Sequence, residues 1–122
     1  ITGEGCSGGA LGLGVADKVL IMEHAYYTVI SPEGCASILW RDATMTNTAA
    51  EALKITGKDL KEFNVVDEII KEPVGGAHKN PEQMAEELKK AIMSSISELE
   101  GLSKKKLKEK RYNKYRKLGV TQ

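Results

Sequence analysis

The chain has 122 residues, of which 41% are hydrophobic and 29% are charged, and its formal net charge is +1. This length predicts one small domain, and the composition is typical of folded soluble protein rather than of disordered or membrane protein. No apolar run approaches the roughly 20 residues of a membrane-spanning helix, so we expect no membrane contact and a cytoplasmic location. Cys6 and Cys35 lie far apart, which predicts free thiols in a reducing compartment.

Charge is distributed unevenly along the chain. Residues 1–74 carry six Lys/Arg and eleven Asp/Glu, a balance of −5, whereas residues 75–122 carry twelve and six, a balance of +6. The basic excess is concentrated in KKKLKEKRYNKYRK, residues 104–117. Such a run can meet nucleic acid, phosphorylated ligands or an acidic partner. Because no nucleic-acid motif accompanies it, we expect a solvated C-terminal helix and no nucleic-acid binding.

The first predicted element is a short glycine-rich helix over residues 8–16. It follows GEGCSGG and a possible strand end at Ile1 and Thr2, and residues 3–17 contain six glycines. Strands are predicted at 18–23 and 25–30, since both stretches are apolar, β-branched or aromatic. Ser31 as N-cap and Pro32 at the first helical position begin a helix that runs to about Arg41. Further helices at 45–55 and from Gly57, and a strand at 65–70, complete the first part.

A long amphipathic helix is predicted after Pro73 and the Gly75-Gly76 break. Asn80 is its N-cap, Gln83 occupies the capping-box position, and Gly101 ends it. A Glu86–Lys90 pair is expected on its exposed side. Its apolar face consists of Met84, Leu88, Ala91, Ile92, Ile96 and Leu99.

Alternating strands and helices predict the α/β class. Only two or three strands are predicted, and so small a sheet leaves long edges exposed. We therefore expect a fragment of a larger domain, divided into an α/β part over residues 1–74 and a helical extension with a basic tail over residues 75–122.

Three interpretations compete for the glycine loop. Gly3, Gly5 and Gly8 satisfy GxGxxG, and Glu23 follows about twenty residues later, as in a dinucleotide site. Against this, almost nothing precedes the loop that could be a strand, and the predicted helix is short and itself contains Gly12 and Gly14. A second interpretation is tight packing on a sheet without any chemistry.

The third interpretation is an oxyanion site formed by main-chain amides. Where Gly8 and Gly9 begin a helix, their N–H groups have no intrahelical acceptor, and the helix dipole favours negative charge in front of them. Each donor aimed at charge that develops in a transition state can lower a barrier by roughly 3 kcal/mol.

The strings GEGCSGGALGLGVADKV, YYTVISPEGCASILWRD, AAEALKIT and VVDEIIKEPVGGAHKNP resemble the alpha subunit of the bacterial acetyl-CoA carboxylase carboxyltransferase, over essentially the whole chain. The resemblance implies a crotonase/ClpP-like superhelix of ββα turns, of which only the C-terminal portion is present. It implies carboxyl transfer from carboxybiotin on the biotin carboxyl carrier protein to acetyl-CoA, forming malonyl-CoA in fatty-acid synthesis. It also implies a heterotetramer with a zinc-bearing beta subunit, and no metal in this chain.

By this resemblance, the alpha subunit stabilises the ureido oxygen of biotin and the beta subunit holds acetyl-CoA. The amides of Gly8 and Gly9, or of Gly9 and Ala10, are the candidate donors, and the sequence does not choose between the two registers. Ser7, Tyr26 and Tyr27 are the candidate substrate-binding residues, with one tyrosine expected to face the core because the two alternate across a strand.

This sequence departs from the family in two respects. The long N-terminal portion of full-length members is absent, so we expect no activity without it and the beta subunit. The family usually has GEGGSGG, whereas position 6 here is Cys; a positive φ there would cost energy. Cys6 has no neighbouring His or Lys in the sequence to activate it as a nucleophile.

Other polar and aromatic residues are expected to be structural. His24 is expected at the surface, His78 to fix its loop or lie at a subunit interface, Glu33 to favour the helix dipole, and Trp40 to pack in the core. An alternative function is a non-catalytic interaction module that offers the 81–99 helix and the basic tail to a partner.

Overall fold

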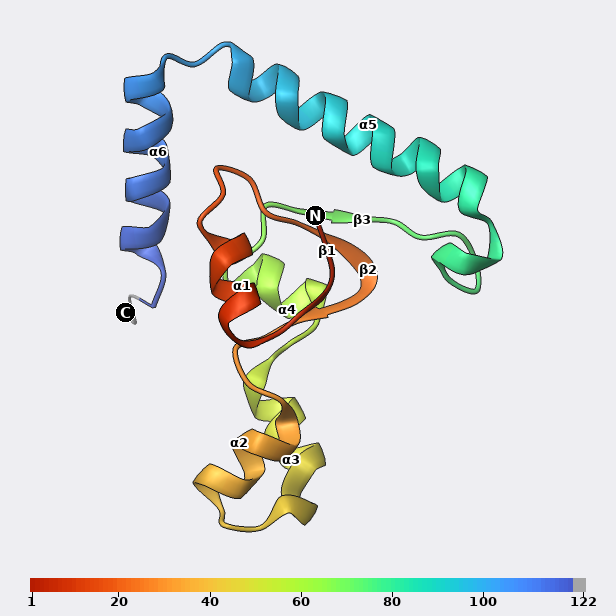
Figure 1. Ribbon diagram of the computed structural model, residues 1–122, viewed down its shortest axis with the longest axis vertical. Helices are drawn as coiled ribbons and strands as arrows, with labels where there is room; N and C mark the ends of the chain where they lie inside the picture. The colour runs from red at the N-terminus through yellow and green to blue at the C-terminus, as the bar shows by residue number, and fades with distance from the viewer. Residues whose placement is uncertain (120–122) are drawn as a thin grey trace.

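The centre of the molecule is a three-stranded parallel sheet. A computed structural model describes residues 1–119, and the sheet has the order β1 (Thr2–Gly5), β2 (Leu20–Tyr27), β3 (Glu68–Ile70) (Figure 1). Parallel neighbours require crossover connections, and these contain α1 (Ser7–Gly14) between β1 and β2 and α4 (Gly57–Glu62) before β3. The predicted α/β class is confirmed.

Alternation along β2 gives the sheet two apolar faces. Ile21 and Tyr27 pack with Val19 and with Ala10 of α1 and Leu60 of α4 on one face. On the other face, Leu20 joins three buried residues from β3 and the long helix that follows it, namely Ile70, Met84 and Ala91. Since successive side chains of a strand point to opposite sides, a single strand holds both layers together.

The two predicted strands at 18–23 and 25–30 are wrong as separate elements. They form the single strand β2, and its pairing with β1 shifts register between Thr2↔Ile21 and Glu4↔Tyr26. The strand ends where Thr28 donates its hydroxyl to the Ile30 carbonyl at 3.0 Å and turns the chain. β3 is also shorter than predicted, because the amides of Val65 and Val66 before it donate to the Leu60 carbonyl of α4, at 2.9 and 3.3 Å.

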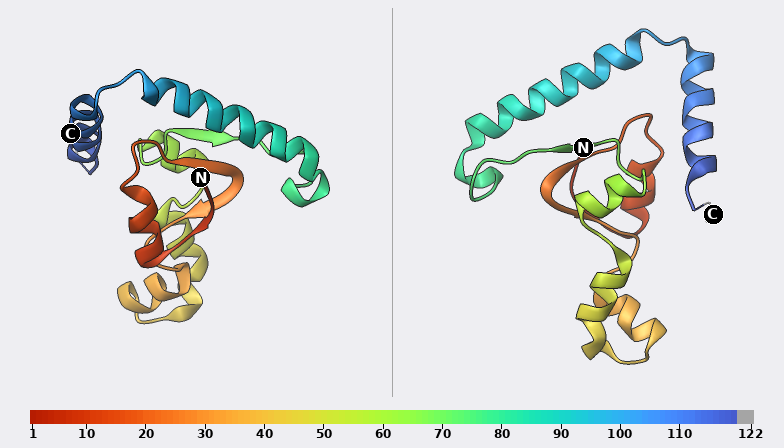
Figure 2. Two further views of the ribbon diagram at one scale, coloured as in Figure 1. Left: turned by 45° about the horizontal axis from the view of Figure 1, so that its top comes forward. Right: turned by 180° about the vertical axis from the view of Figure 1, so that it is seen from behind.

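A helical pair projects away from the sheet in every view (Figures 1 and 2). It comprises α2 (Pro32–Leu39), the 3-10 turn η1 (Ala43–Met45) and α3 (Thr46–Leu53). Ser31 caps α2 as predicted, accepting the Gly34 amide at 3.1 Å. The pair has a small apolar cluster of its own around Cys35, Ala36 and Ala49. Trp40, expected in the core, is 40% exposed because it lies at the end of α2 on this projecting pair.

The long helix α5 (Pro81–Glu100) follows the 3-10 turn η2 (Ala77–Lys79) and crosses the sheet (Figure 2). Asn80 caps it as predicted, accepting the Gln83 amide at 3.1 Å. Only part of its predicted apolar face is buried, since Ile92 and Ile96 remain 42% exposed. Lys90 pairs with Glu87 at 2.7 Å rather than with the predicted Glu86.

The basic helix α6 (Lys104–Lys117) has no buried residue and is largely solvated as expected, but it also contacts the core. It lies beside the end of α1 (Figure 1), where Arg111 contacts Asp17 at 3.5 Å and Lys114 contacts Asp67 at 2.5 Å. The Tyr115 hydroxyl also donates to the Ala16 carbonyl at 3.3 Å. The acidic first part and the basic last part of the chain therefore meet within one molecule. No helix among residues 1–119 is long and apolar enough to cross a bilayer.

Candidate functional site at the beginning of helix α1

The candidate site lies at the carboxyl end of β1, where the chain turns into α1. Ligands of parallel α/β sheets commonly bind at this edge. Cys6 is extended, with φ −141° and ψ 154°, and Ser7 has a φ of +57°. Position 6 therefore does not need a positive φ, and the left-handed residue is Ser7, at a cost of about 1–2 kcal/mol.

The main-chain amides that open α1 differ in their availability. The Ala10 amide donates to the Cys6 carbonyl at 3.3 Å, and Ala10 is 1% exposed. The register that uses Gly9 and Ala10 would have to break this bond, which makes Ala10 a poor donor. Gly8 and Gly9 precede the first intrahelical bond, and the Cys6 side chain makes no capping bond to them within the described residues.

The six glycines of the loop fall into two groups. A Cβ on Gly5 would lie 2.5 Å from the Tyr27 ring, and one on Gly14 would lie 2.9 Å from the Tyr27 hydroxyl. These two glycines allow Tyr27 to pack beneath α1. A Cβ on any of the other four would meet no atom of residues 1–119 within 4 Å, and none of them has a positive φ; they are Gly3, Gly8, Gly9 and Gly12.

The packing interpretation thus explains only part of the loop. Glycine in a helix costs about 0.5–1 kcal/mol relative to alanine, and α1 accepts this cost at Gly8, Gly9 and Gly12 without an internal reason in the described chain. Bare backbone at such positions lets a ligand or another surface approach closely.

Tyr27, a candidate substrate-binding residue, is buried beneath α1. It is 9% exposed, and its hydroxyl donates to the Ala10 carbonyl inside the layer between β2 and α1. Alternation along the strand places its neighbour Tyr26 on the other side, with 38% of its surface exposed. The prediction that one of the two tyrosines faces the core is confirmed, and Tyr26 is the exposed one.

Two acidic residues that the sequence did not single out for this role act on Tyr26. The negative charge of Glu4 raises the pKa of the Tyr26 phenol most, with further contributions from burial, from Cys6 and from Glu33. A phenol is protonated at neutral pH and can donate a hydrogen bond; the raised pKa extends this state to more alkaline pH. The backbone of Tyr26 also forms an isolated antiparallel β-bridge with Thr56, just before α4. Pairing of Glu4 with Tyr26 across the sheet was not visible in the sequence.

The dinucleotide interpretation keeps its first objection and gains another. The strand β1 contains Gly3 and Gly5 of the GxGxxG string, so only Thr2 of this strand precedes the string, whereas a dinucleotide-binding glycine turn follows its strand. The acidic residue it requires is engaged elsewhere, because the Glu23 carboxylate accepts the Glu72 amide at 3.1 Å. The helix has only eight residues. Glu23 is thus used to join β2 to the segment after β3.

The histidines lie around Glu72, away from the glycine loop. The Glu72 carboxylate accepts the amides of His24 at 3.0 Å and Ala77 at 2.9 Å. Burial tends to raise the pKa of Glu72, but these bonds and the nearby rings of His24 and His78 lower it. His78 also packs over Gly76, whose φ is +100°. These contacts agree with the loop-fixing role expected for His78.

Comparison with known proteins decides the family. The family described as acetyl co-enzyme A carboxylase carboxyltransferase-like matches residues 1–119. The chain belongs to this family. Three curated carboxyltransferase relatives share 55–56% of aligned residues: from Trichodesmium erythraeum (55%; 98% of this chain, 37% of the relative), Clostridium perfringens (56%; 95% and 43%) and Thermus thermophilus (56%; 98% and 38%).

All three relatives are named acetyl-coenzyme A carboxylase carboxyl transferase subunit alpha. The chain spans about two-fifths of their length. Membership of the carboxyltransferase family confirms the resemblance drawn from the sequence. The spacing Gly5-Cys6-Ser7-Gly8-Gly9 was the available signal for a strained strand-to-helix turn at Ser7, since Gly-x-Ser-x-Gly is typical of such turns.

Proposed function

We propose that the chain is part of an acetyl-CoA carboxylase carboxyltransferase alpha subunit. The reaction transfers the carboxyl group of carboxybiotin, carried by the biotin carboxyl carrier protein, to acetyl-CoA and forms malonyl-CoA. A zinc-bearing beta subunit holds acetyl-CoA, and the crotonase-type fold is completed by chain outside residues 1–122. Family membership and the relatives' names support this proposal.

The observation that carries the catalytic part of the proposal is the open space in front of Gly8 and Gly9. Their amides belong to the first turn of α1, where N–H groups lack intrahelical acceptors. A carbonyl-type oxygen can approach them without meeting a Cβ. The left-handed Ser7 turns the chain so that β1 leads directly into these donors.

Bound carboxybiotin supplies the transferable carboxyl group and, in the ureido ring, the oxygen on which negative charge develops. In this proposal Gly8 and Gly9 donate to that oxygen and hold the charge. Charge-assisted bonds to main-chain amides are stronger than neutral ones and need no reorganisation during the reaction. The Tyr26 phenol and the Ser7 hydroxyl orient the rest of the ligand at the same edge of the sheet.

Apolar side chains exposed around α1 supply a surface for the other parts of the enzyme. Leu11, Leu13 and Val15 are all strongly exposed, although a helix that is apolar on every side is normally buried. We assign this surface to the remainder of the subunit and the beta subunit. Both cysteines are free, which supports a cytoplasmic enzyme.

A matched pair of glycine substitutions tests the oxyanion role. Gly9→Val in the full alpha–beta complex should lower the rate of carboxyl transfer about 100-fold, because a side chain then blocks the approach to the donors. Gly101→Val is the control, since Gly101 also has open space and a negative φ, and it should leave the rate unchanged. Equal rates in the two variants, with both folded by circular dichroism, would contradict the proposal.

The non-catalytic alternative is favoured by one observation, the exposed Ile92 and Ile96 on α5. It predicts that the chain binds the beta subunit through α5 while Gly9→Val has no effect on turnover. Gel filtration of Ile92→Asp with the beta subunit, paired with the Gly9→Val rate, separates the two functions: loss of the complex with normal turnover of Gly9→Val supports the binding module.

A further inference from the structure

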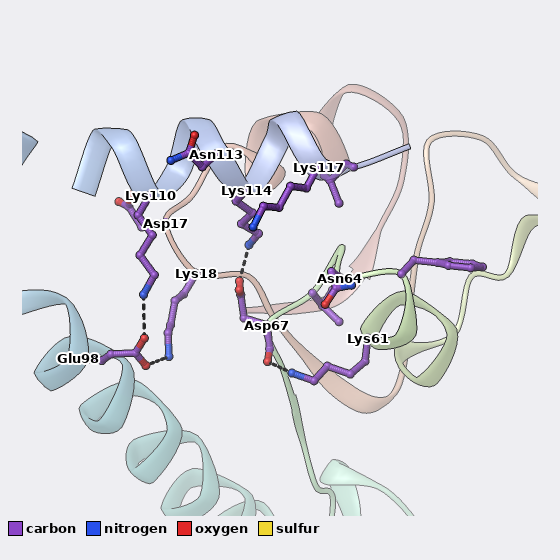
Figure 3. A pocket seen from close by; sticks show the side chains of 13 residues that line it. Asp17, Lys18, Lys61, Asn64, Asp67, Glu98, Lys110, Asn113, Lys114 and Lys117 are labelled. Atoms are coloured by element: carbon purple, nitrogen blue, oxygen red, sulfur yellow. Dashed lines mark hydrogen bonds and ion pairs between the residues drawn. The ribbon is translucent and has the colours of Figure 1, made fainter. Parts of the chain in front are cut away.

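A cavity of about 600 Å³ lies between α6 and the α/β core (Figure 3). Lysines from three separate segments line it, and we call it the lysine cavity: Lys18 after α1, Lys61 on α4, and Lys110, Lys114 and Lys117 on α6. Three carboxylates also line it, from Asp17, Asp67 and Glu98. Five ammonium groups therefore face three carboxylates, an excess of two positive charges.

The carboxylates are already occupied. Glu98 accepts both Lys18 and, at 3.1 Å, Lys110, and these lysines lower its pKa, the hydrogen bond from Lys18 most. Asp67 accepts Lys114 at 2.5 Å and the Val19 amide at 2.6 Å. Asp17 pairs with Arg111, which lies outside the cavity lining.

Two lysines of the cavity remain without a carboxylate partner. Lys61 donates only to the main-chain carbonyl of Asp67, and Lys117 makes no ion pair within residues 1–119. In Figure 3, Lys117 and Lys61 approach the cavity from opposite walls, with Lys114 and Asp67 between them. The Asn64 and Asn113 side chains, also in the lining, can supply neutral donors.

We propose that the lysine cavity binds a phosphorylated small molecule, with Lys61 and Lys117 as its principal contacts. Ammonium groups are compact point charges that commonly bind phosphate. The excess of two positive charges matches a phosphate group, which carries nearly two negative charges at neutral pH. Phe63, Val66 and Leu118 complete the lining and offer apolar contact to the organic part, as in a nucleotide.

The shape of the site favours a small ligand over a nucleic acid. Long nucleic acids track extended basic surfaces, whereas these lysines converge from three segments on one hollow whose size falls within the range of ligand pockets. The cavity lies next to the segment that follows the C-terminal end of α1, whereas the proposed oxyanion donors lie at the N-terminal end of α1. This inference is therefore independent of the carboxyl-transfer proposal.

Titration of the full-length protein with adenosine 5′-diphosphate, followed by calorimetry and by amide chemical shifts, tests the site. Lys61→Gln and Lys117→Gln should each weaken binding about three- to tenfold. Lys104→Gln, on the same helix but outside the lining, removes the same charge and should have little effect. Glu98→Gln should strengthen binding, because it releases Lys18 and Lys110 from their shared carboxylate.

Inorganic phosphate, adenosine and coenzyme A complete the design. Phosphate competing with the nucleotide while adenosine does not would support a phosphate site. Competition by coenzyme A would assign it to the nucleotide end of that molecule, and its absence to a free nucleotide. Equal losses in Lys104→Gln and Lys117→Gln, weaker binding in Glu98→Gln, or no shifts at the cavity residues would overturn the proposal.

Discussion

The two ends of α1 offer different binding groups to a negatively charged ligand. At its beginning, Gly8 and Gly9 offer main-chain amides in open space, without a basic side chain in the cluster formed by Glu4, Cys6, Tyr26 and Glu33. Beyond its end, the lysine cavity offers flexible ammonium groups that are partly neutralised by carboxylates. The first site depends on backbone geometry and the second on charge.

This difference has a physical consequence. Amides in a helical turn cannot be titrated and are held in place by the fold, so they suit charge that develops only during a reaction. Lysines with competing carboxylates bind through long-range attraction that salt screens. The four predictions below test this contrast, from the largest expected effect to the smallest.

Rigid backbone at the beginning of α1 requires the packing around Tyr27. Gly5→Ala should lower the free energy of unfolding by about 1–3 kcal/mol, because its Cβ would lie 2.5 Å from the Tyr27 ring and 2.9 Å from the Thr2 methyl. Gly8→Ala, in open space, should instead raise it by about 0.5 kcal/mol. Urea unfolding of both variants measures this, and equal changes would show that the two glycines do not differ in role.

The partly buried pair between Lys114 and Asp67 should hold α6 to the core. Lys114→Gln is expected to cost about 1 kcal/mol of unfolding free energy. Lys90→Gln, which breaks the exposed pair with Glu87, should change it far less, because solvent screens an exposed pair. A larger loss for Lys90→Gln in thermal unfolding would mean that burial does not set the strength of these pairs.

Added salt should weaken binding at the lysine cavity without changing the effect of the glycine site on the reaction rate. Between about 0.05 and 0.5 M NaCl, nucleotide affinity of the lysine cavity should fall several-fold, since the Debye length shrinks from roughly 14 to 4 Å. The ratio of carboxyl-transfer rates between the wild-type complex and Gly9→Val should stay constant over the same range. A ratio that falls in parallel with nucleotide affinity would show that the glycine site also acts through screened charge.

Low pH should affect the lysine cavity, through Glu98, and high pH should affect the candidate site, through Tyr26. Because lysines lower the folded-state pKa of Glu98 below its ordinary value of 4.5, the stability it contributes is present above pH 4.5 and lost as pH falls through the lower folded value. Glu98→Gln should therefore flatten the acid side of the stability curve. At the candidate site, the pKa of Tyr26 should lie above its ordinary value of 10.0. Glu4→Gln should lower this pKa, as measured by NMR titration of the Tyr26 ring carbons.

Local chemistry along the chain was sufficient for most elements. Ser31 and Asn80 are caps because their side chains accept amides three residues ahead, and such caps are visible in any sequence. The strand boundaries were not predicted correctly: the strands expected at 18–23 and 25–30 merge into one, Leu20–Tyr27, because β1 pairs with the chain on both sides of the expected break, at Ile21 and at Tyr26.

At the candidate site, the glycine pattern and the family strings identified the region, and the choice among its residues required coordinates. Alternation along a strand predicts that one of Tyr26 and Tyr27 is buried, but only the position of α1 decides that it is Tyr27. Likewise, only the helix register shows that the Ala10 amide is already bonded. Backbone hydrogen bonds depend on neighbours that the sequence does not place.

The sequence by itself determined the α/β class, the helix caps, the family and the glycine-rich opening of α1, because these depend on residues close together in the chain. Tertiary structure alone decided which glycines make room for Tyr27, which amides stay open, and where the basic helix lies. The lysine cavity brings together residues 18, 61 and 117. The composition predicts attraction between the acidic and basic parts of the chain, but it does not predict which residues pair. That pairing follows from the path of α5 across the sheet, which brings α6 back to α1.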